Sequence, residues 1–244
     1  MKILILGGTG FIGTKIYDLV KGKYDIKNLS LSTGVDLRKQ NKLSKFLKKE
    51  YKVIINCAAH VGNLNYLDKK SADIINDNLK IYLNIYKEIS KSSHHPKIIN
   101  LISNCVYPGD QRVQKESNIF YGNIHQSVEP FGLSKLILLK LSYFYYKQYK
   151  IKSLNLVLPN AFGPGDHTDI NRSHALNGII VRMLQAKRKN LDKFEIWGTG
   201  KPKREWIYAE DIARIIKLTI KKKKLTNGFK IINIAQNKSY SINF

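Results

Sequence analysis

Several kinds of residue are scarce in this sequence, and each scarcity narrows the class of protein. Only two residues are cysteine, Cys57 and Cys105, and both lie in apolar segments, so a disulfide framework is not expected and a reducing compartment fits. No apolar run reaches the length of about eighteen residues that a membrane-spanning helix needs. Met1 leads straight into the apolar run Ile3 to Leu6 without a basic leader or cleavage site. We therefore expect a cytoplasmic protein.

Acidic residues are also few. The chain has 18 Asp and Glu against 42 Lys and Arg, a formal net charge of +24, and such a basic surface can attract nucleic acid, membranes or anionic substrates. The lysines are spread over expected helix faces, and the one dense run, Lys221 to Lys224, ends an amphipathic segment where cations suit the helix dipole. Zinc-finger spacing, an RNP-like aromatic motif and a basic zipper are all missing. We expect a solvated surface that attracts anionic nucleotides, with no nucleic acid, membrane or metal ion as partner.

The distribution of apolar residues indicates the fold class. Short β-rich runs occupy residues 2–6, 26–31, 52–58, 97–103, 152–158 and 229–235. Between them lie longer segments with apolar residues every three or four positions, most clearly 71–90, 133–149 and 173–189. This alternation predicts an α/β fold, a doubly wound parallel sheet of the Rossmann type with helices on both faces. Several strands are apolar throughout, as expected when both faces of the sheet are covered.

The pattern changes at about residue 159, where Pro159 and the run Gly163-Pro164-Gly165 precede a polar loop. In doubly wound proteins, insertions after late strands cover the ligand crevice. We therefore expect a dinucleotide-binding Rossmann domain over residues 1–158. A small C-terminal substrate lobe over 159–244 is expected to interleave with the last strands of the sheet.

A glycine-rich turn, Gly7 to Gly13, directly follows the first strand and precedes the first helix. Residues without a Cβ let backbone amides approach a pyrophosphate at the positive end of the helix. The turn therefore predicts dinucleotide binding by Gly7, Gly10, Phe11, Ile12 and Gly13. Ala58 and Ala59, which end the third strand, either let the backbone lie against the same cofactor or are simply small core residues.

The end of the second strand bears on which cofactor is bound. An NAD site usually places a carboxylate about twenty residues beyond the glycines, but here the strand ends in Ser30-Leu31-Ser32-Thr33. The Ser32 hydroxyl, with Arg38 and Lys39 nearby, would accept a 2′-phosphate, so NADP (NADPH) is favoured over NAD; alternatively, the hydroxyls merely cap a loop. Asp36 and Leu37 are expected to contact adenine.

Two further motifs complete a family resemblance. Ser103-Asn104-Cys105-Val106-Tyr107-Pro108 ends the fourth strand, and Phe131-Gly132-Leu133-Ser134-Lys135 follows later in the chain. With the glycine turn they resemble the extended short-chain dehydrogenase/reductases, the NAD-dependent epimerase/dehydratase family, whose site joins a Ser or Thr to a Tyr-x-x-x-Lys pair. Ser103 and Lys135 match, and the four-residue spacing puts the pair on one helix face.

Phe131 stands at the family's tyrosine position, and it has no proton to donate. Slow or absent ketone reduction is therefore expected. Either the residue was substituted deliberately to trap a ligand, or this is a natural member that has given up hydride transfer.

Within the superfamily the sequence resembles the GDP-L-fucose synthases. The similar segments are 58–62, 76–79, 103–108, 159–166, 171–174 and 197–205. The resemblance implies 3,5-epimerisation of a GDP-4-keto-6-deoxy sugar and then NADPH-dependent reduction of the 4-keto group. It assigns Cys105 and His174 to the exchange of the C3 and C5 protons, which the ketone acidifies. It also assigns substrate binding to Asn160, His174, Arg182, Trp197 and Arg204.

The same resemblance implies a homodimer formed through paired helices, for which 71–90 and 133–149 are candidates. Packing in the core of a single subunit explains these apolar stretches equally well. Family members continue beyond the point that corresponds to Phe244, so the lobe is either abbreviated or the chain is a fragment. Two other functions stay open. One is a 4-reductase or epimerase of another GDP-sugar, such as a heptose. The other is a non-catalytic protein that binds NADP or a nucleotide sugar.

Overall fold

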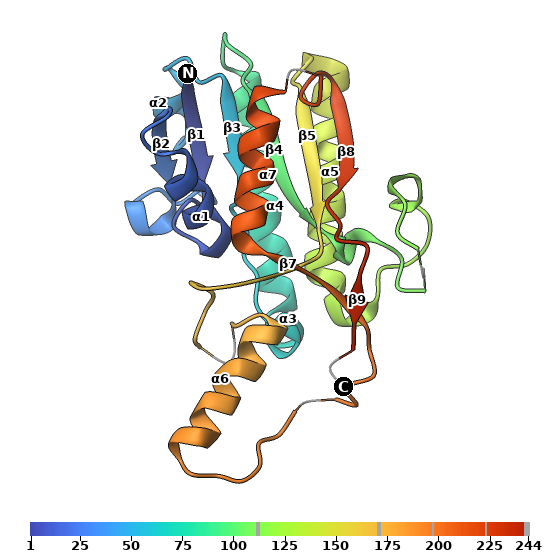
Figure 1. The fold of residues 1–244 in the computed structure, drawn as a ribbon. Coiled ribbons are helices and arrows are strands. Elements are labelled where there is room, and N and C mark those ends of the chain that lie inside the picture. Colours follow the sequence, from blue (N-terminus) through green and yellow to red (C-terminus); the bar gives the residue numbers. More distant parts are fainter. Residues whose placement is uncertain (111–112, 170–171, 197, 223, 242–244) are drawn as a thin grey trace.

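A computed structural model describes residues 1–110, 113–169, 172–196, 198–222 and 224–241. Its centre is a six-stranded parallel sheet in the order β2-β1-β3-β4-β5-β8 (Figure 1). The strands are β1 (Lys2–Leu6), β2 (Asp25–Leu29), β3 (Val53–Asn56), β4 (Lys97–Ser103), β5 (Ser153–Leu158) and β8 (Phe229–Asn233). The predicted doubly wound α/β fold is confirmed, and the strand ends differ only slightly from those predicted.

Helices cover both faces of this sheet. Helices α1 (Phe11–Val20) and α7 (Ala209–Lys221) pack together on one face, and α4 (Ser71–Ser90) and α5 (Glu129–Tyr149) pack together on the other (Figure 1). The alternation of side chains along β1 explains both layers, because Ile3 and Ile5 join the core beneath α1 and α7 while Leu4 and Leu6 join the opposite core. In the described residues, no helix has both the length and the apolar character that crossing a membrane requires.

Three asparagines cross the middle of the buried sheet. Asn56, Asn100 and Asn155 are register partners on β3, β4 and β5, and their amides form a row, with Asn56 Nδ2 donating to Asn100 Oδ1 (3.1 Å) and Asn100 Nδ2 donating to Asn155 Oδ1 (2.9 Å). Tyr86 Oη and Ser142 Oγ, from α4 and α5, complete the row. These partners satisfy the buried amides, and Asn56 Oδ1 also accepts from the Ala58 amide, which fixes the backbone where β3 ends.

The residues after β5 leave the main sheet and later return to it. They form a second, three-stranded sheet of β6 (Asn160–Phe162), β7 (Arg204–Tyr208) and β9 (Ser239–Tyr240), together with α6 (Ala175–Arg188), which extends away from the body (Figure 1). Helix α7 and β8 then rejoin the Rossmann layers. These short strands were not predicted, because two to five residues show too little periodicity. The proposed division at 158/159 falls between β5 and β6 and stays a prediction.

Short elements complete the chain. They are α2 (Ser44–Leu47), α3 (Leu64–Lys69) and the 3-10 turns η1 (Leu31–Thr33), η2 (Asn104–Val106), η3 (Glu116–Asn118) and η4 (Gln126–Val128). Several of them lie directly after strands, so they shape the edge of the sheet at which the parallel strands end.

Candidate active site

The glycine turn follows β1, which lies between β2 and β3 in the sheet. The strand order reverses at this point, and doubly wound sheets bind ligands in the crevice beyond the strand ends at such a switch point. Gly7 has φ of 75°, and a Cβ there would lie 2.7 Å from the Ala58 amide nitrogen. A Cβ on Gly13 would lie 2.7 Å from Gly8 Cα and collide with the Gly7 carbonyl. Gly10 caps α1. The turn is thus a backbone cradle at a helix N-terminus, and it fits a dinucleotide pyrophosphate.

Hydroxyl groups occupy the position beside the turn where NAD sites carry a carboxylate. Thr9 Oγ1 lies 2.9 Å from Ser30 Oγ and 2.7 Å from Ser32 Oγ, and the two serine oxygens are 3.0 Å apart. Thr33 Oγ1 accepts a hydrogen bond from the Ser30 amide. This cluster of Thr9, Ser30, Ser32 and Thr33, which we call the hydroxyl cluster, presents neutral donors where a 2′-phosphate would lie.

The nearby charged residues are arranged differently from the expectation. Arg38 was expected to attract a phosphate, but its Nε and Nη2 donate to Asp36 (2.9 and 3.0 Å) and its Nη1 donates to Asp77 (3.0 Å). The guanidinium lowers the pKa of the Asp36 carboxyl. Leu37 is buried in the core and its carbonyl accepts from Asn84. Arg38 is therefore engaged by carboxylates, and the adenine contacts of Asp36 and Leu37 stay predictions.

Ser103, Cys105 and Lys135 lie together at the carboxyl end of β4. The Cys105 amide donates to Ser103 Oγ (3.2 Å). Burial raises the pKa of the Cys105 thiol, while a hydrogen bond to the Ser103 hydroxyl and the charges of Arg204 and Lys135 oppose that rise. The thiol is thus protonated at neutral pH in the ligand-free protein. The structure brings these predicted residues into one region with Arg204, which begins β7.

Lys135 is only 4% exposed and donates to the Leu101 carbonyl (2.8 Å). Burial lowers the pKa of Lys135 to about 8. Its Nζ lies 5.5 Å from the centroid of the Phe131 ring and 5.3 Å from that of Tyr82. The ammonium group therefore faces an apolar ring at the position where the family resemblance implies a phenol.

His174, at the N-cap of α6, is held by Asp166 and lies beside the glycine turn. Its Nδ1 lies 2.8 Å from Asp166 Oδ1, its amide donates to Asp166 Oδ2 (3.2 Å), and its ring centroid is 5.8 Å from that of Phe11. The Asp166 side chain is fully buried and also accepts from the His167 amide. An ionised Asp166 leaves the proton on His174 Nδ1 and the lone pair on Nε2. No contact in the described part of the chain joins His174 directly to Cys105.

The other predicted substrate-binding residues are more scattered. Asn160, on β6, donates to the Glu205 carbonyl (3.1 Å). Arg204 is exposed and donates to the Lys203 carbonyl. Arg182 lies on α6, where it lines a shallow hollow with Gln185 and Lys189. Trp197 lies outside the described residues.

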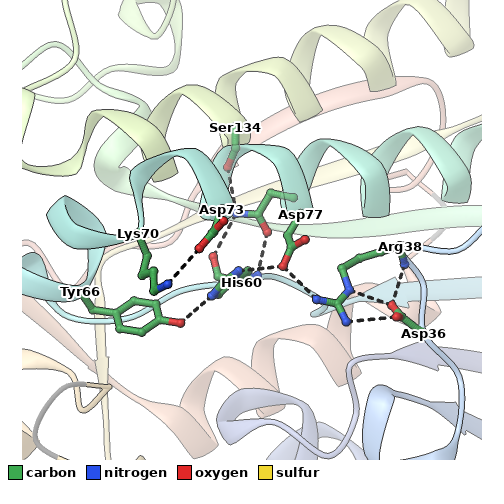
Figure 2. Close-up of polar contacts among 9 residues, drawn as sticks. Asp36, Arg38, His60, Tyr66, Lys70, Asp73, Asp77 and Ser134 are labelled. Atoms are coloured by element: carbon green, nitrogen blue, oxygen red, sulfur yellow. Dashed lines mark hydrogen bonds and ion pairs between the residues drawn. The ribbon is translucent and has the colours of Figure 1, made fainter.

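Several polar residues near the site were not predicted. Asp166 ends the quoted segment 159–166, but no role was predicted for it. His60, Tyr66 and Asp77 form a hydrogen-bonded set at the end of β3 (Figure 2). His60 belongs to the quoted segment 58–62, but nothing in the spacing of Tyr66 marks it as a partner.

A glycine cradle at the switch point of a parallel sheet, with Ser103 and Lys135 at a nearby strand end, defines a dinucleotide-binding enzyme of the Rossmann class. The chain belongs to the NAD dependent epimerase/dehydratase family, whose sequence profile matches residues 3–235. The cofactor implied by that family is a nicotinamide dinucleotide.

Individual relatives agree with this assignment. The chain is 30% identical over 223 residues to a GDP-L-fucose synthase of Sinorhizobium fredii, covering 90% of this chain and 70% of the relative. It is 29% identical over 246 residues to a GDP-L-colitose synthase of Yersinia pseudotuberculosis, covering 99% and 79%. Among solved structures, a GDP-L-fucose synthetase from Naegleria fowleri bound to NADP superposes with a TM-score of 0.84 at 26% identity, covering 98% of this chain and 79% of the other.

Proposed function

We propose that this chain is an NADP-dependent nucleotide-sugar epimerase/reductase that acts on a GDP-4-keto-6-deoxy-hexose. The observation that carries the proposal is the grouping of Ser103 and Cys105, at the carboxyl end of β4, with Lys135 of α5 and Arg204, which begins β7. The dinucleotide cradle follows β1 of the same sheet. The similarity to GDP-L-fucose synthases, at up to 30% identity among the relatives compared, supports this substrate class.

The proposed epimerisation uses the acidity of protons next to a ketone. His174 Nε2, whose ring is oriented by Asp166, removes a proton from C3 or C5, and the electron pair moves onto the 4-keto oxygen to form an enolate. The Ser103 hydroxyl donates a hydrogen bond to that oxygen. The protonated Cys105 thiol returns a proton to the opposite face of the same carbon. The His174 imidazolium then releases its proton to solvent and the Cys105 thiolate takes one up, so each cycle conserves protons and inverts one centre.

The cofactor and nucleotide assignments rest on the residues around this centre. We assign the pyrophosphate to the cradle of Gly7, Gly10 and Gly13, with Phe11 and Ile12 beside it and Ala58 and Ala59 across from it. We assign a 2′-phosphate to the hydroxyl cluster, and so prefer NADP. When bound, the reduced nicotinamide supplies the hydride for the keto reduction, and Lys135 would hold the neighbouring ribose.

The GDP portion requires a separate set of residues. Arg204, Arg182 and Trp197 are assigned to the diphosphate and base, since a guanidinium matches phosphate oxygens and an indole stacks on a purine. Asn160 is assigned to the sugar. The basic surface of the chain, with 42 Lys and Arg, favours the approach of such an anionic substrate.

Exchange of substrate protons with solvent tests the epimerase function directly. With a GDP-4-keto-6-deoxy-hexose in D₂O, deuterium should enter C3 and C5, as followed by NMR. Cys105→Ser and His174→Gln should each slow the exchange by about 100-fold or more, the usual contribution of a positioned acid or base. Wild-type protein that binds the sugar without any exchange would contradict the epimerase function and favour a non-catalytic binding protein.

Phe131 should limit the second half of the reaction. Without a phenol beside Lys135, reduction by NADPH should be slow, and Phe131→Tyr should accelerate it. Equal rates of NADPH oxidation in the two proteins would contradict this assignment.

One alternative substrate class has a specific observation behind it. The similarity to a GDP-L-colitose synthase extends over 99% of this chain, so another GDP-4-keto sugar, including a heptose, could replace the 6-deoxy-hexose. Comparing the turnover and product stereochemistry of several GDP-keto-sugars would distinguish them.

A further inference from the structure

A row of polar side chains runs from Tyr66 through His60 and Asp77 to Arg38, as Figure 2 shows. Arg38 Nη1 and His60 Nδ1 both meet Asp77 Oδ2, each at 3.0 Å. His60 Nε2 lies 2.8 Å from the hydroxyl of Tyr66, which comes from α3. The row thus joins a phenol, an imidazole and a carboxylate in series, with a guanidinium behind the carboxylate.

The charges in this row fix the proton positions. Asp77 accepts from the Arg38 guanidinium and is therefore ionised, so His60 Nδ1 carries a proton and donates it to Asp77. In the neutral ring, Nε2 accepts from the Tyr66 hydroxyl. In the protonated ring, Nε2–H donates to the phenol oxygen, and the hydroxyl proton of Tyr66 is free to turn toward another acceptor.

Hydrogen bonds also connect His60 of this row to Phe131, the position at which the family phenol is missing. The backbone of His60 exchanges two hydrogen bonds with the Asn78 side chain (2.7 and 3.0 Å). Asn78 Nδ2 also donates to Ser134 Oγ (3.3 Å), and Ser134 Oγ donates to the Phe131 carbonyl (2.7 Å). A short path of hydrogen bonds therefore links the His60 backbone to Phe131.

Side-chain packing also places the Tyr66 ring close to the cluster that contains Phe131. Phe131, with Leu67 and Ile74, forms a small apolar cluster, and Tyr66 and Cys105 pack against that cluster. Tyr66 is half-buried. The ring of Tyr66 and the side chain of Cys105 therefore pack against the same small cluster, of which Phe131 is a member.

We propose that Tyr66 is the proton donor for keto reduction in this chain, in place of the phenol missing at position 131, with His60 and Asp77 as positioning residues. The proposal rests on the proposed reductase function. The ketone carbon receives hydride from the reduced nicotinamide, and the carbonyl oxygen takes the hydroxyl proton of Tyr66. The resulting phenolate takes the Nε2 proton of the His60 imidazolium, which solvent then replaces. One ketone becomes an alcohol, and one NADPH becomes NADP⁺.

A double-mutant cycle tests the proposal. NADPH oxidation with a GDP-4-keto-6-deoxy-hexose is measured in wild type, Tyr66→Phe, Phe131→Tyr and the double variant. Tyr66→Phe should lower the wild-type rate by about 100-fold, the scale of a positioned general acid. In the Phe131→Tyr background the same change should alter the rate less than about threefold, because the restored phenol beside Lys135 replaces Tyr66.

Other outcomes would overturn the proposal. An unchanged rate in Tyr66→Phe, an equal loss in both backgrounds, or no NADPH oxidation by wild type each excludes Tyr66 as the donor. Deuterium exchange at C3 and C5, measured without nicotinamide, should be the same in wild type and Tyr66→Phe. Loss of exchange in wild type would instead mark failure of the proposed epimerase function.

A measurement without substrate tests the positioning residues. The ¹⁵N NMR shifts of His60 should report the Nδ1-protonated tautomer when the ring is neutral, and Asp77→Asn should change that tautomer balance. Asp77→Asn should also slow reduction in the Phe131 protein but not in Phe131→Tyr. A His60 tautomer that is the same in Asp77→Asn would contradict the proposed row.

Discussion

The two ends of the proposed cofactor crevice are built in different ways. At the cradle end, the proposed binding group is the backbone of Gly7 and Gly13, and a Cβ at either position would collide with neighbouring backbone. At the other end, which we call the ketone end because the substrate ketone is proposed to bind there, the functional groups are side chains. There Lys135 faces the ring of Phe131. The cradle end matches the family pattern throughout, whereas the ketone end departs from it at one residue.

This difference shows which parts of a site can tolerate change. Several backbone segments pack against the glycines of the cradle, so one added methyl group would disturb several contacts at once. A side-chain acid can instead be exchanged for another group that reaches the same region. His60, Tyr66 and Asp77 offer such a replacement.

The largest expected effect concerns stability at the ketone end. Burial lowers the pKa of Lys135 from 10.5 to about 8, so the charged form is disfavoured in the folded protein. Between these two pH values the unfolded state binds more protons than the folded state, and the Lys135 contribution to stability rises with pH. The free energy of unfolding of wild type should therefore rise with pH relative to that of Lys135→Met. The difference between the two proteins should change by on the order of 3 kcal/mol between pH 8 and pH 10.5. Denaturant melts of both proteins at several pH values check this, and parallel curves would contradict it.

At the cradle end, Gly13→Ala should weaken NADPH binding by about 100-fold, since overpacking costs about 1–3 kcal/mol and the turn must open. Asp18→Ala, at an exposed position of α1 outside the turn, is the control. It should lose less than about tenfold. Calorimetric titration measures both, and circular dichroism shows that both proteins are folded. Equal losses would mean that the turn is not a close-packed cradle.

Asp166→Asn should slow deuterium exchange by about 30-fold. Removing a general acid or base costs about 100-fold or more, and this variant keeps His174 but loses the carboxylate that orients its ring. Asp192→Asn, at an exposed carboxylate of the lobe, is the control. An unchanged exchange rate in Asp166→Asn would separate the Asp166–His174 pair from the exchange.

The smallest effect concerns the choice of cofactor. Ser32→Asp places a carboxylate in the hydroxyl cluster, where it would repel a 2′-phosphate and accept from a ribose hydroxyl. The ratio of NADPH affinity to NADH affinity should fall by about tenfold, which corresponds to about 1.4 kcal/mol. Comparing the two dissociation constants in both proteins checks this, and an unchanged ratio would place the phosphate elsewhere.

Most of the main sheet could be predicted from the sequence, because buried parallel strands such as Lys97–Ser103 are nearly continuous apolar runs and the long helix Ser71–Ser90 has clear periodicity. The second sheet could not, since Ser239–Tyr240 contains only two residues. For the site, local motifs marked Gly13, Ser103 and Lys135. The ion pair between Arg38 and Asp77 was missed because Asp77 lies 39 residues further along the chain and only the fold brings the two together.

The central claim is that residues 7 to 13 grip a nicotinamide dinucleotide. Isothermal titration calorimetry of folded wild-type protein tests it most directly. The account predicts saturable binding of NADPH with one site per chain, and weaker binding of NADH. Folded protein that releases or absorbs no heat with either coenzyme would contradict it.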